Sequence, residues 1–191
     1  MSDGVHLRDM TIDDCEAVAA VRVRGWQSSY VGMVPQRYLD AMSVEADAAR
    51  RRAHLTGDGS AVGNIVAERD GRVVGWACYG PYREEADAPP PRGEPAADAE
   101  LYAAYVLPEQ HSTGAGRALL TESLSRAAHD GFPRMFLWVL AENARARRFY
   151  EKAGFAFDGT AEPFELDGVL VPEVRYVRRL SAADAAAVSL G

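Results

Sequence analysis

Two glycines, Gly114 and Gly116, stand where an apolar run gives way to the start of a predicted helix. We expect the run, residues 101–107, to be a strand and residues 108–113 to be a short polar turn. The first turn of a helix carries backbone N–H groups without partners at the positive end of the helix dipole. Phosphate oxygens accept hydrogen bonds from these N–H groups, and their negative charge is stabilised by the helix dipole. Glycine lets a bulky pyrophosphate approach the backbone closely. The order strand, glycine turn and helix therefore predicts an anion site.

The glycine turn alone fits several kinds of site. A Walker-type loop requires Gly-Lys-Ser/Thr, whereas Gly116 is followed by Arg117 and Ala118, so that interpretation fails. A dinucleotide fingerprint requires a third small residue, and Leu119 stands there. An ordinary tight turn between a strand and a helix is as good an interpretation, so a second motif must decide.

That second motif is residues 143–155, which follow a predicted buried strand at residues 135–140. Helical spacing places Asn143, Arg147 and Tyr150 on one face, while Phe149 and Ala153 share the neighbouring face and can enter the core. Here the chain closely resembles the GNAT superfamily of N-acetyltransferases, which move an acetyl group from acetyl-CoA to an amine. The matching segments are His111-Ser112-Thr113-Gly114-Ala115-Gly116, against Gln/Arg-x-x-Gly-x-Gly/Ala, and Asn143 with Ala146 through Phe155, against Asn…Ala-x-x-Phe-Tyr-Glu-Lys-x-Gly-Phe.

The resemblance implies an acetyl-CoA site without a metal. His111 departs from the family's Gln or Arg, but the family binds there mainly through backbone N–H groups, so cofactor binding should survive. Asn143 has two equal interpretations, a contact with the pantetheine arm or an ordering of the turn between strand and helix. The residues expected to contact the cofactor are Tyr105, Val106, His111, Ser112, Thr113, Gly114, Ala115, Gly116, Arg117, Ala118, Asn143, Arg147 and Tyr150.

The same resemblance suggests two catalytic residues. The amine must be neutral when it attacks, so the reaction needs a base or a water path. Glu100 begins the strand before the glycine turn, where similar enzymes often place a carboxylate, although a surface acid at a strand end is an equal interpretation. Tyr150 matches the family position whose hydroxyl lies near the CoA sulfur, so we expect it to protonate the departing thiolate rather than only to pack. Backbone N–H groups near Val106 would stabilise the developing oxyanion.

The acceptor amine is less well defined. Trp26, Tyr30 and Tyr38 lie in the segment that walls the acceptor site of such enzymes, and with Glu100 they are the expected substrate-binding residues, although each aromatic singly fits an ordinary core somewhat better. A small-molecule primary amine, attacked directly in a ternary complex, is the preferred acceptor. The alternatives are a protein or peptide amine, or a non-catalytic sensor that binds acyl-CoA on the same fold.

Composition narrows the classes of protein. The chain has 191 residues with 48% hydrophobic and 26% charged residues, which fits one globular domain. The net charge of −7 argues against nucleic-acid binding and mildly favours a cationic substrate. Neither a signal pattern nor a membrane-spanning apolar run is visible, and Cys15 and Cys78 have no metal-ligand spacing. We therefore expect a cytoplasmic protein without a membrane partner, and the family resemblance allows a homodimer.

The expected fold is α/β, with a mixed, mainly antiparallel central sheet of GNAT type and helices on both faces. Residues 1–180 form one domain, residues 80–98 a long insertion loop (a solvated insertion rather than a lid) and residues 181–191 an Ala-rich tail. Asp70-Gly71 predicts a hairpin, and the last strands are expected to be short and split by a loop around Asp167-Gly168. The expected strands are residues 5–9, 65–68, 72–79, 101–107, 135–140, 155–157 and 174–177, and the helices begin near residues 11, 36, 44, 114 and 143.

Overall fold

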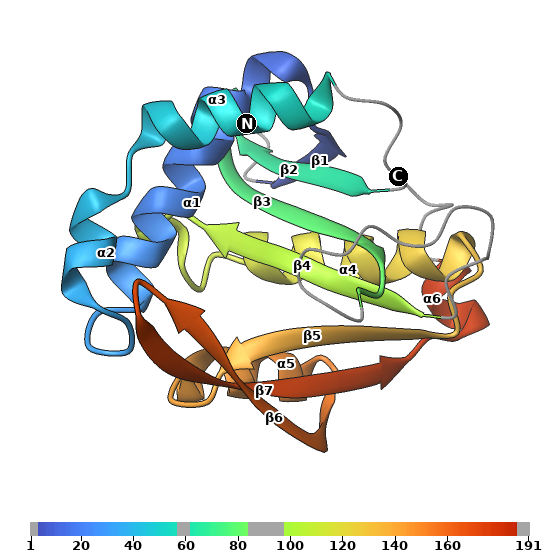
Figure 1. Ribbon diagram of the computed structural model, residues 1–191. Helices are drawn as coiled ribbons and strands as arrows, with labels where there is room; N and C mark the ends of the chain where they lie inside the picture. Colours follow the sequence, from blue (N-terminus) through green and yellow to red (C-terminus); the bar gives the residue numbers. More distant parts are fainter. Residues whose placement is uncertain (1–3, 57–61, 84–97, 187–191) are drawn as a thin grey trace.

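The computed structural model describes residues 4–56, 62–83 and 98–186, which form one seven-stranded sheet with helices on both faces (Figure 1). The strand order is β1-β2-β3-β4-β5-β7-β6, and only the pair β4 and β5 is parallel within these ranges. The expected α/β class and mixed, mainly antiparallel sheet are thus confirmed. The strands are β1 (His6–Asp9), β2 (Gly63–Arg69), β3 (Arg72–Pro81), β4 (Ala99–Val106), β5 (Arg134–Leu140), β6 (Ala156–Leu166) and β7 (Val169–Arg179).

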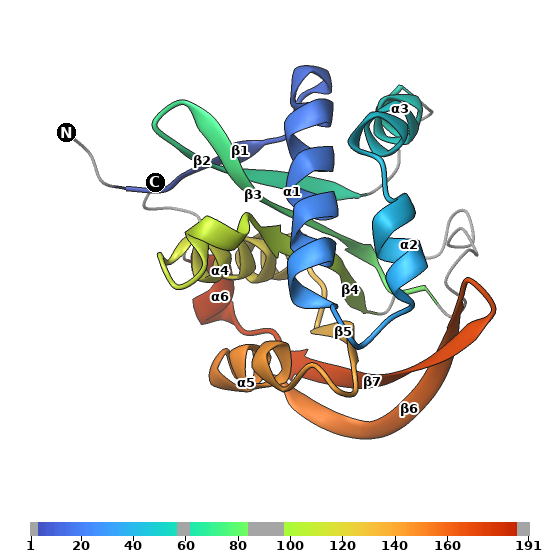
Figure 2. The same ribbon diagram turned by 90° about the vertical axis from the view of Figure 1, so that its left-hand side faces the viewer.

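Two helical layers enclose the sheet (Figure 2). Val18 and Val21 of α1 pack on one face against Val66 and Trp76, and α4 and α5 pack on the other face in the largest core cluster. No described helix is long and apolar enough to cross a bilayer. The helices are α1 (Cys15–Ser29), α2 (Gln36–Ala41), α3 (Val44–Leu55), α4 (Ala115–His129), α5 (Ala144–Lys152) and α6 (Ala182–Ala186), with 3-10 turns η1 (Ile12–Asp14) and η2 (Pro108–Gln110).

The parallel strands β4 and β5 stay together for only two register pairs, Ala99 with Met135 and Glu100 with Phe136. Beyond Glu100 they separate, and Figure 1 shows them meeting at one end and diverging toward the other. A bulge accompanies the separation, because Cys78 pairs with Ala103 and Tyr79 with Leu101, which leaves Tyr102 without a register partner on β3. The sheet is therefore split on one side of residues 101–106.

The C-terminal part differs from the expectation. Two strands separated at Asp167-Gly168 are present as predicted, but their expected lengths are wrong: β6 and β7 are 11 residues each and pair as a hairpin, with a register shift between Phe157 and Ala161. Both turn residues have positive φ, 53° and 75°, which suits a two-residue turn. The sequence concealed the hairpin because Gly159, Pro163 and Pro172 are unfavourable strand residues, and because most of β6 is exposed and lacks an alternating apolar face.

The flanking segments were only partly anticipated. β3 extends to Pro81 and β4 begins at Ala99, while residues 84–97 of the expected insertion loop lie outside the described residues. Part of the expected tail is the helix α6, which the Asp184 carboxylate caps by accepting a hydrogen bond from the backbone N–H of Ser181 at 2.9 Å.

Candidate active site

The glycine turn begins α4 as the sequence predicted. Gly114 is the N-cap, with a left-handed φ of 95°, and the first helical hydrogen bond runs from the backbone N–H of Ala118 to the carbonyl of Gly114 at 2.9 Å. The amides of residues 115–117 have no backbone partner in the described part of the chain. A Cβ on Gly116 would meet only Val106 and Phe149, at 3.8 and 3.9 Å. The turn thus presents free N–H groups and an open backbone, which is what a pyrophosphate requires.

Side chains from two other elements hold this turn in place. Arg69 of β2 donates to the Gln110 side chain at 2.7 Å and to the carbonyl of Thr113 at 3.3 Å. Arg24 of α1 donates to both carboxylate oxygens of Glu109, at 3.1 and 3.0 Å. The sequence pattern did not identify these two arginine contacts, because the partners lie 41 and 85 residues further along the chain. At the head of the turn, partial burial and the charge of Arg145 lower the pKa of His111, so its imidazole is neutral at neutral pH.

Three tyrosines meet where β4 and β5 separate. Tyr105 lies on the open half of β4, under α1, which approaches closely because a Cβ on Gly25 would already lie 3.4 Å from the Tyr105 ring. Burial raises the pKa of Tyr30, at the end of α1, well above its ordinary value, with smaller contributions from Tyr105 and Tyr150. Burial also raises the pKa of Tyr150, with Tyr105 as its next cause. The phenol of Tyr150 therefore stays protonated at neutral pH.

Asn143 and Arg147 serve the local structure. The Asn143 side chain accepts a hydrogen bond from the Ala146 backbone N–H at 3.0 Å and caps α5, which supports the second of its two interpretations. Arg147 donates to the Tyr176 hydroxyl and to the Ala141 carbonyl, both at 3.0 Å. The two residues fix α5, and thus Tyr150, against the sheet.

Glu100 is buried at the last register pair before the split. Arg83 binds it through its backbone N–H at 3.1 Å and its guanidinium at 2.8 Å, and the guanidinium also lies 3.9 Å above the centroid of the Tyr102 ring. Both carboxylate oxygens of Glu100 therefore accept hydrogen bonds from Arg83.

A second carboxylate near the split was missed from the sequence. Glu173 of β7 is partly buried, and burial together with the negative charge of Glu100 raises its pKa to about 7. The only signal in the sequence was an acidic residue next to the predicted strand 174–177, whose start was placed five residues too late.

The predicted acceptor wall is a real aromatic cluster. The ring centroids of Trp26 lie 4.8 Å from Tyr30 and 5.8 Å from Tyr38, and these residues pack on a small core that includes Leu39 and Leu140. The indole N–H of Trp26 is buried and has no partner among the described residues. The cluster thus serves as core and leaves one donor unsatisfied, which marks a place for a polar ligand or a water.

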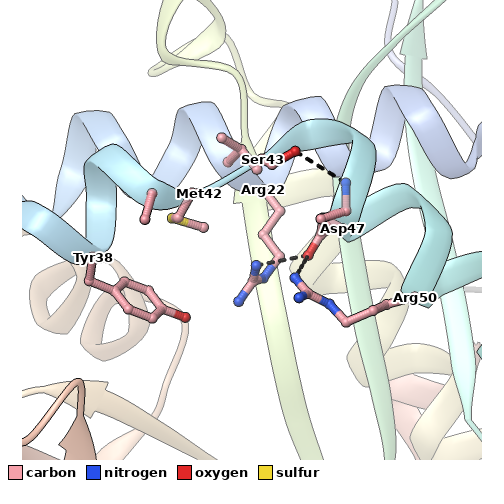
Figure 3. Close-up of a pocket in the computed structure, with 9 residues that line it drawn as sticks. Arg22, Tyr38, Met42, Ser43, Asp47 and Arg50 are labelled. Carbon is pink, nitrogen blue, oxygen red and sulfur yellow. Dashed lines mark hydrogen bonds and ion pairs between the residues drawn. The ribbon is translucent and has the colours of Figure 1, made fainter.

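A cavity of about 150 Å³ lies beside this cluster, between α1, α2 and α3. Figure 3 shows Tyr38 facing Arg22 and Arg50, which both bind Asp47. On the far side of the cluster, Arg37 of α2 binds the carboxylate and, at 2.7 Å, the backbone carbonyl of Asp167 in the β6–β7 turn. That contact joins α2 to the hairpin.

A sheet split between parallel strands, with a helix start that presents free backbone amides beside the split, is the arrangement expected of a protein that holds an extended, phosphate-bearing cofactor between its strands. Comparison with known proteins gives the family. The model described as "Acetyltransferase (GNAT) family" matches residues 24–155, so the chain belongs to that family and the resemblance is confirmed.

Relatives and solved structures agree with this family. The uncharacterized N-acetyltransferase YuaI of Bacillus subtilis is 32% identical over 172 residues, which cover 89% of this chain and 90% of YuaI. A mycothiol acetyltransferase of Frankia casuarinae is 36% identical over 109 residues, 57% of this chain and 31% of that protein. The PaiA N-acetyltransferase of Thermoplasma acidophilum, solved with coenzyme A, shares the fold with a TM-score of 0.69 at 19% identity, over 92% of this chain and 99% of that one.

Proposed function

We propose that this chain transfers the acetyl group of acetyl-CoA to a primary amine of a small molecule, by direct attack in a ternary complex. The observation that carries the proposal is the position of the α4 glycine turn beside the β4–β5 split. The turn would hold the pyrophosphate, and the open edge of β4 would hold the amide-bearing arm of the cofactor. Membership of the GNAT family supports both assignments.

The residues present fit this cofactor. The free amides of residues 115–117 and the open space around Gly114 would bind the phosphates, together with the backbone N–H of Ser112. The backbone N–H groups of His111 and Thr113 already donate to Pro108 and Gln110 and shape the turn. Tyr105 and Val106 lie on the half of β4 that β5 leaves unpaired. Leu107 donates to Val74 of β3, so the alternation of an antiparallel ladder directs the Val106 backbone groups to the open edge, where they would be available to the cofactor arm and to the developing oxyanion. Acetyl-CoA supplies the activated thioester, and the protein supplies its position and its electrostatic surroundings.

We assign Tyr150 the role of general acid. Its phenol is protonated at neutral pH, and no described side chain or backbone group hydrogen-bonds to it. It would donate its proton to the thiolate that leaves as the carbon–nitrogen bond forms and the carbon–sulfur bond breaks. The proton that the nitrogen loses on becoming an amide nitrogen would restore the phenol, so that the products are the neutral amide and the CoA thiol. Asn143 and Arg147, by fixing α5, keep the phenol at the split.

Two features favour a small acceptor over a protein chain. The Arg37–Asp167 contact joins α2 to the β6–β7 turn, which would obstruct an extended polypeptide lying along this side of the sheet. One of the relatives is named a mycothiol acetyltransferase, which links this family to a small molecule by name. Carboxylates at the split and the negative net charge suit a cationic amine.

An acceptor screen that follows the release of free CoA tests the proposal, after calorimetry has measured acetyl-CoA binding. We expect release with at least one small primary amine. Release only with peptide or protein amines would replace the small acceptor with a polypeptide. Binding of acetyl-CoA without release to any amine would indicate the non-catalytic sensor, and absence of binding would refute the cofactor site.

A further inference from the structure

Glu173 lies at the open end of the split. On one side it pairs in register with Leu140, the last residue of β5, where β5 has already left β4, and on the other side with Glu162 of β6. Its neighbours Val174 and Tyr176 belong to the core cluster that α4 and α5 cover. Side chains alternate between the two faces of a strand, and Tyr176 is three residues from Glu173. The Glu173 side chain therefore points to the opposite face, the α1 and α2 face, where the proposed aromatic acceptor wall lies.

No described side chain neutralises this carboxylate. Glu173 has no hydrogen bond and no ion pair within residues 4–56, 62–83 and 98–186, although it is partly buried. Its nearest cation along β7, Arg175, is bound to Asp158 at 2.7 Å and to the Tyr82 hydroxyl at 2.7 Å. Arg37 of α2 is bound to Asp167.

The remaining groups that face Glu173 are acids and phenols. Glu100 of β4 raises the pKa of Glu173, and Glu162 of β6 stands opposite it in register. Tyr30, at the end of α1, is near enough for the charge of Glu173 to raise the Tyr30 pKa. A partly buried carboxylate in such surroundings is available to a cationic ligand that approaches over the acceptor wall.

Glu100 is less available than Glu173 to a cationic ligand, because both of its carboxylate oxygens accept hydrogen bonds from Arg83. An ammonium that approached Glu100 would have to displace the Arg83 guanidinium from it. Glu173 has no such partner to lose. Its pKa of about 7 also lies near the operating pH, where a base is most effective.

We propose that Glu173, rather than Glu100, is the general base of the transfer reaction, and this inference rests on the function proposed above. The Glu173 carboxylate binds the acceptor ammonium and takes one proton from it. The products of this step are the neutral amine, R–NH2, and the Glu173 carboxylic acid, which returns the proton to solvent after the transfer. Glu100, held by Arg83, contributes negative charge at the split and keeps that end of it in place.

The first test needs no acceptor. In protein labelled with ¹³C at the glutamate side-chain carboxyls, one resonance should titrate near pH 7 and should be missing from Glu173→Gln. Glu100→Gln should move that titration to lower pH, because it removes the neighbouring negative charge. If no carboxyl titrates above the ordinary glutamate range, or if the one that does so persists in Glu173→Gln, the assignment is overturned.

The second test uses the best amine from the screen and measures kcat/KM against pH. Glu173→Gln should lower kcat/KM by about 10²-fold or more at neutral pH and remove the rise on the acidic side of the profile. Glu165→Gln, an exposed acid on β6, is the matched control and should leave the profile unchanged. A Glu173→Gln variant that keeps wild-type kcat/KM and the wild-type profile overturns the proposal while the enzyme's acetyl transfer stands. A folded wild-type protein that accepts no amine refutes the proposed function itself, and the base assignment with it.

Discussion

The raised pKa of Glu173 predicts that this carboxyl destabilises the folded protein at neutral pH. Burial and Glu100 move its pKa from 4.5 to about 7. Because the folded value is the higher one, the unfolded chain loses this proton first as the pH rises. The free energy of unfolding therefore falls between about pH 4.5 and 7 and is level above that range, as far as this group is concerned.

The size of the effect follows from the shift. One pKa unit corresponds to about 1.4 kcal/mol, so the shift from 4.5 to about 7 sets an upper limit of about 3.5 kcal/mol. The carboxyl is partly exposed, and solvent screening reduces the loss to on the order of 1–2 kcal/mol. Glu173→Gln keeps the volume of the side chain and removes the ionisation, so it should be more stable than wild type above pH 7 by this amount.

Thermal unfolding of both proteins across this pH range measures the difference as a shift in the midpoint temperature. The variant and wild type should have equal stability below pH 4.5, and the variant's midpoint temperature should exceed that of wild type by about 2–8 °C above pH 7. Glu165→Gln, which alters an exposed carboxyl, should show no such dependence. A stability difference between Glu173→Gln and wild type that is the same at both ends of the range would show that the carboxyl is not buried as described.

Three further changes test other parts of the site. Gly116→Val should fold, since a Cβ there makes only ordinary contacts, but should weaken acetyl-CoA binding by about 10-fold or more in calorimetry by blocking the pyrophosphate; unchanged affinity would misplace the phosphates. Asn143→Ala should cost about 1 kcal/mol of folding free energy, measured by urea unfolding, through loss of the α5 cap, and an unchanged stability would contradict that role. Tyr150→Phe should lower kcat on the order of 10²-fold with little change in acetyl-CoA affinity, and a wild-type kcat where chemistry limits turnover would exclude the phenol as the acid.

Local patterns predicted the elements that carry the family motif. The glycine turn and the α5 motif are contiguous in sequence, and their geometry depends on helix caps and on the 3.6-residue period, which residue types reveal directly. The Asp70-Gly71 hairpin was likewise predicted from its turn, and β2 and β3 pair around it.

The remaining features depend on register and long-range contacts. The split requires that β4 and β5, joined through α4, part after two register pairs, and no local propensity encodes where parallel strands separate. The ion pair between Arg83 and Glu100 and the position of Glu173 follow from the bulge at Tyr102 and from the place of β7 between β5 and β6. The β6–β7 hairpin escaped prediction because most of β6 is exposed and because Gly159, Pro163 and Pro172 interrupt the strand pattern.

The split sheet and the unpaired carboxyl have a common physical basis. Residues 101–106 of β4 lack the hydrogen bonds that a continuous sheet would give them on the β5 side, and each buried group left so costs about 1–3 kcal/mol. Glu173, in turn, is a partly buried carboxylate without a cation. Both features lower the folding stability, and packing elsewhere must offset this cost. Ligands would remove the cost, because a cofactor arm can bind the strand edge and an ammonium can bind the carboxylate. The unpaired edge of β4 and the Glu173 carboxylate thus both lie where the two proposed substrates would meet. This is the pattern expected of a preorganised active site.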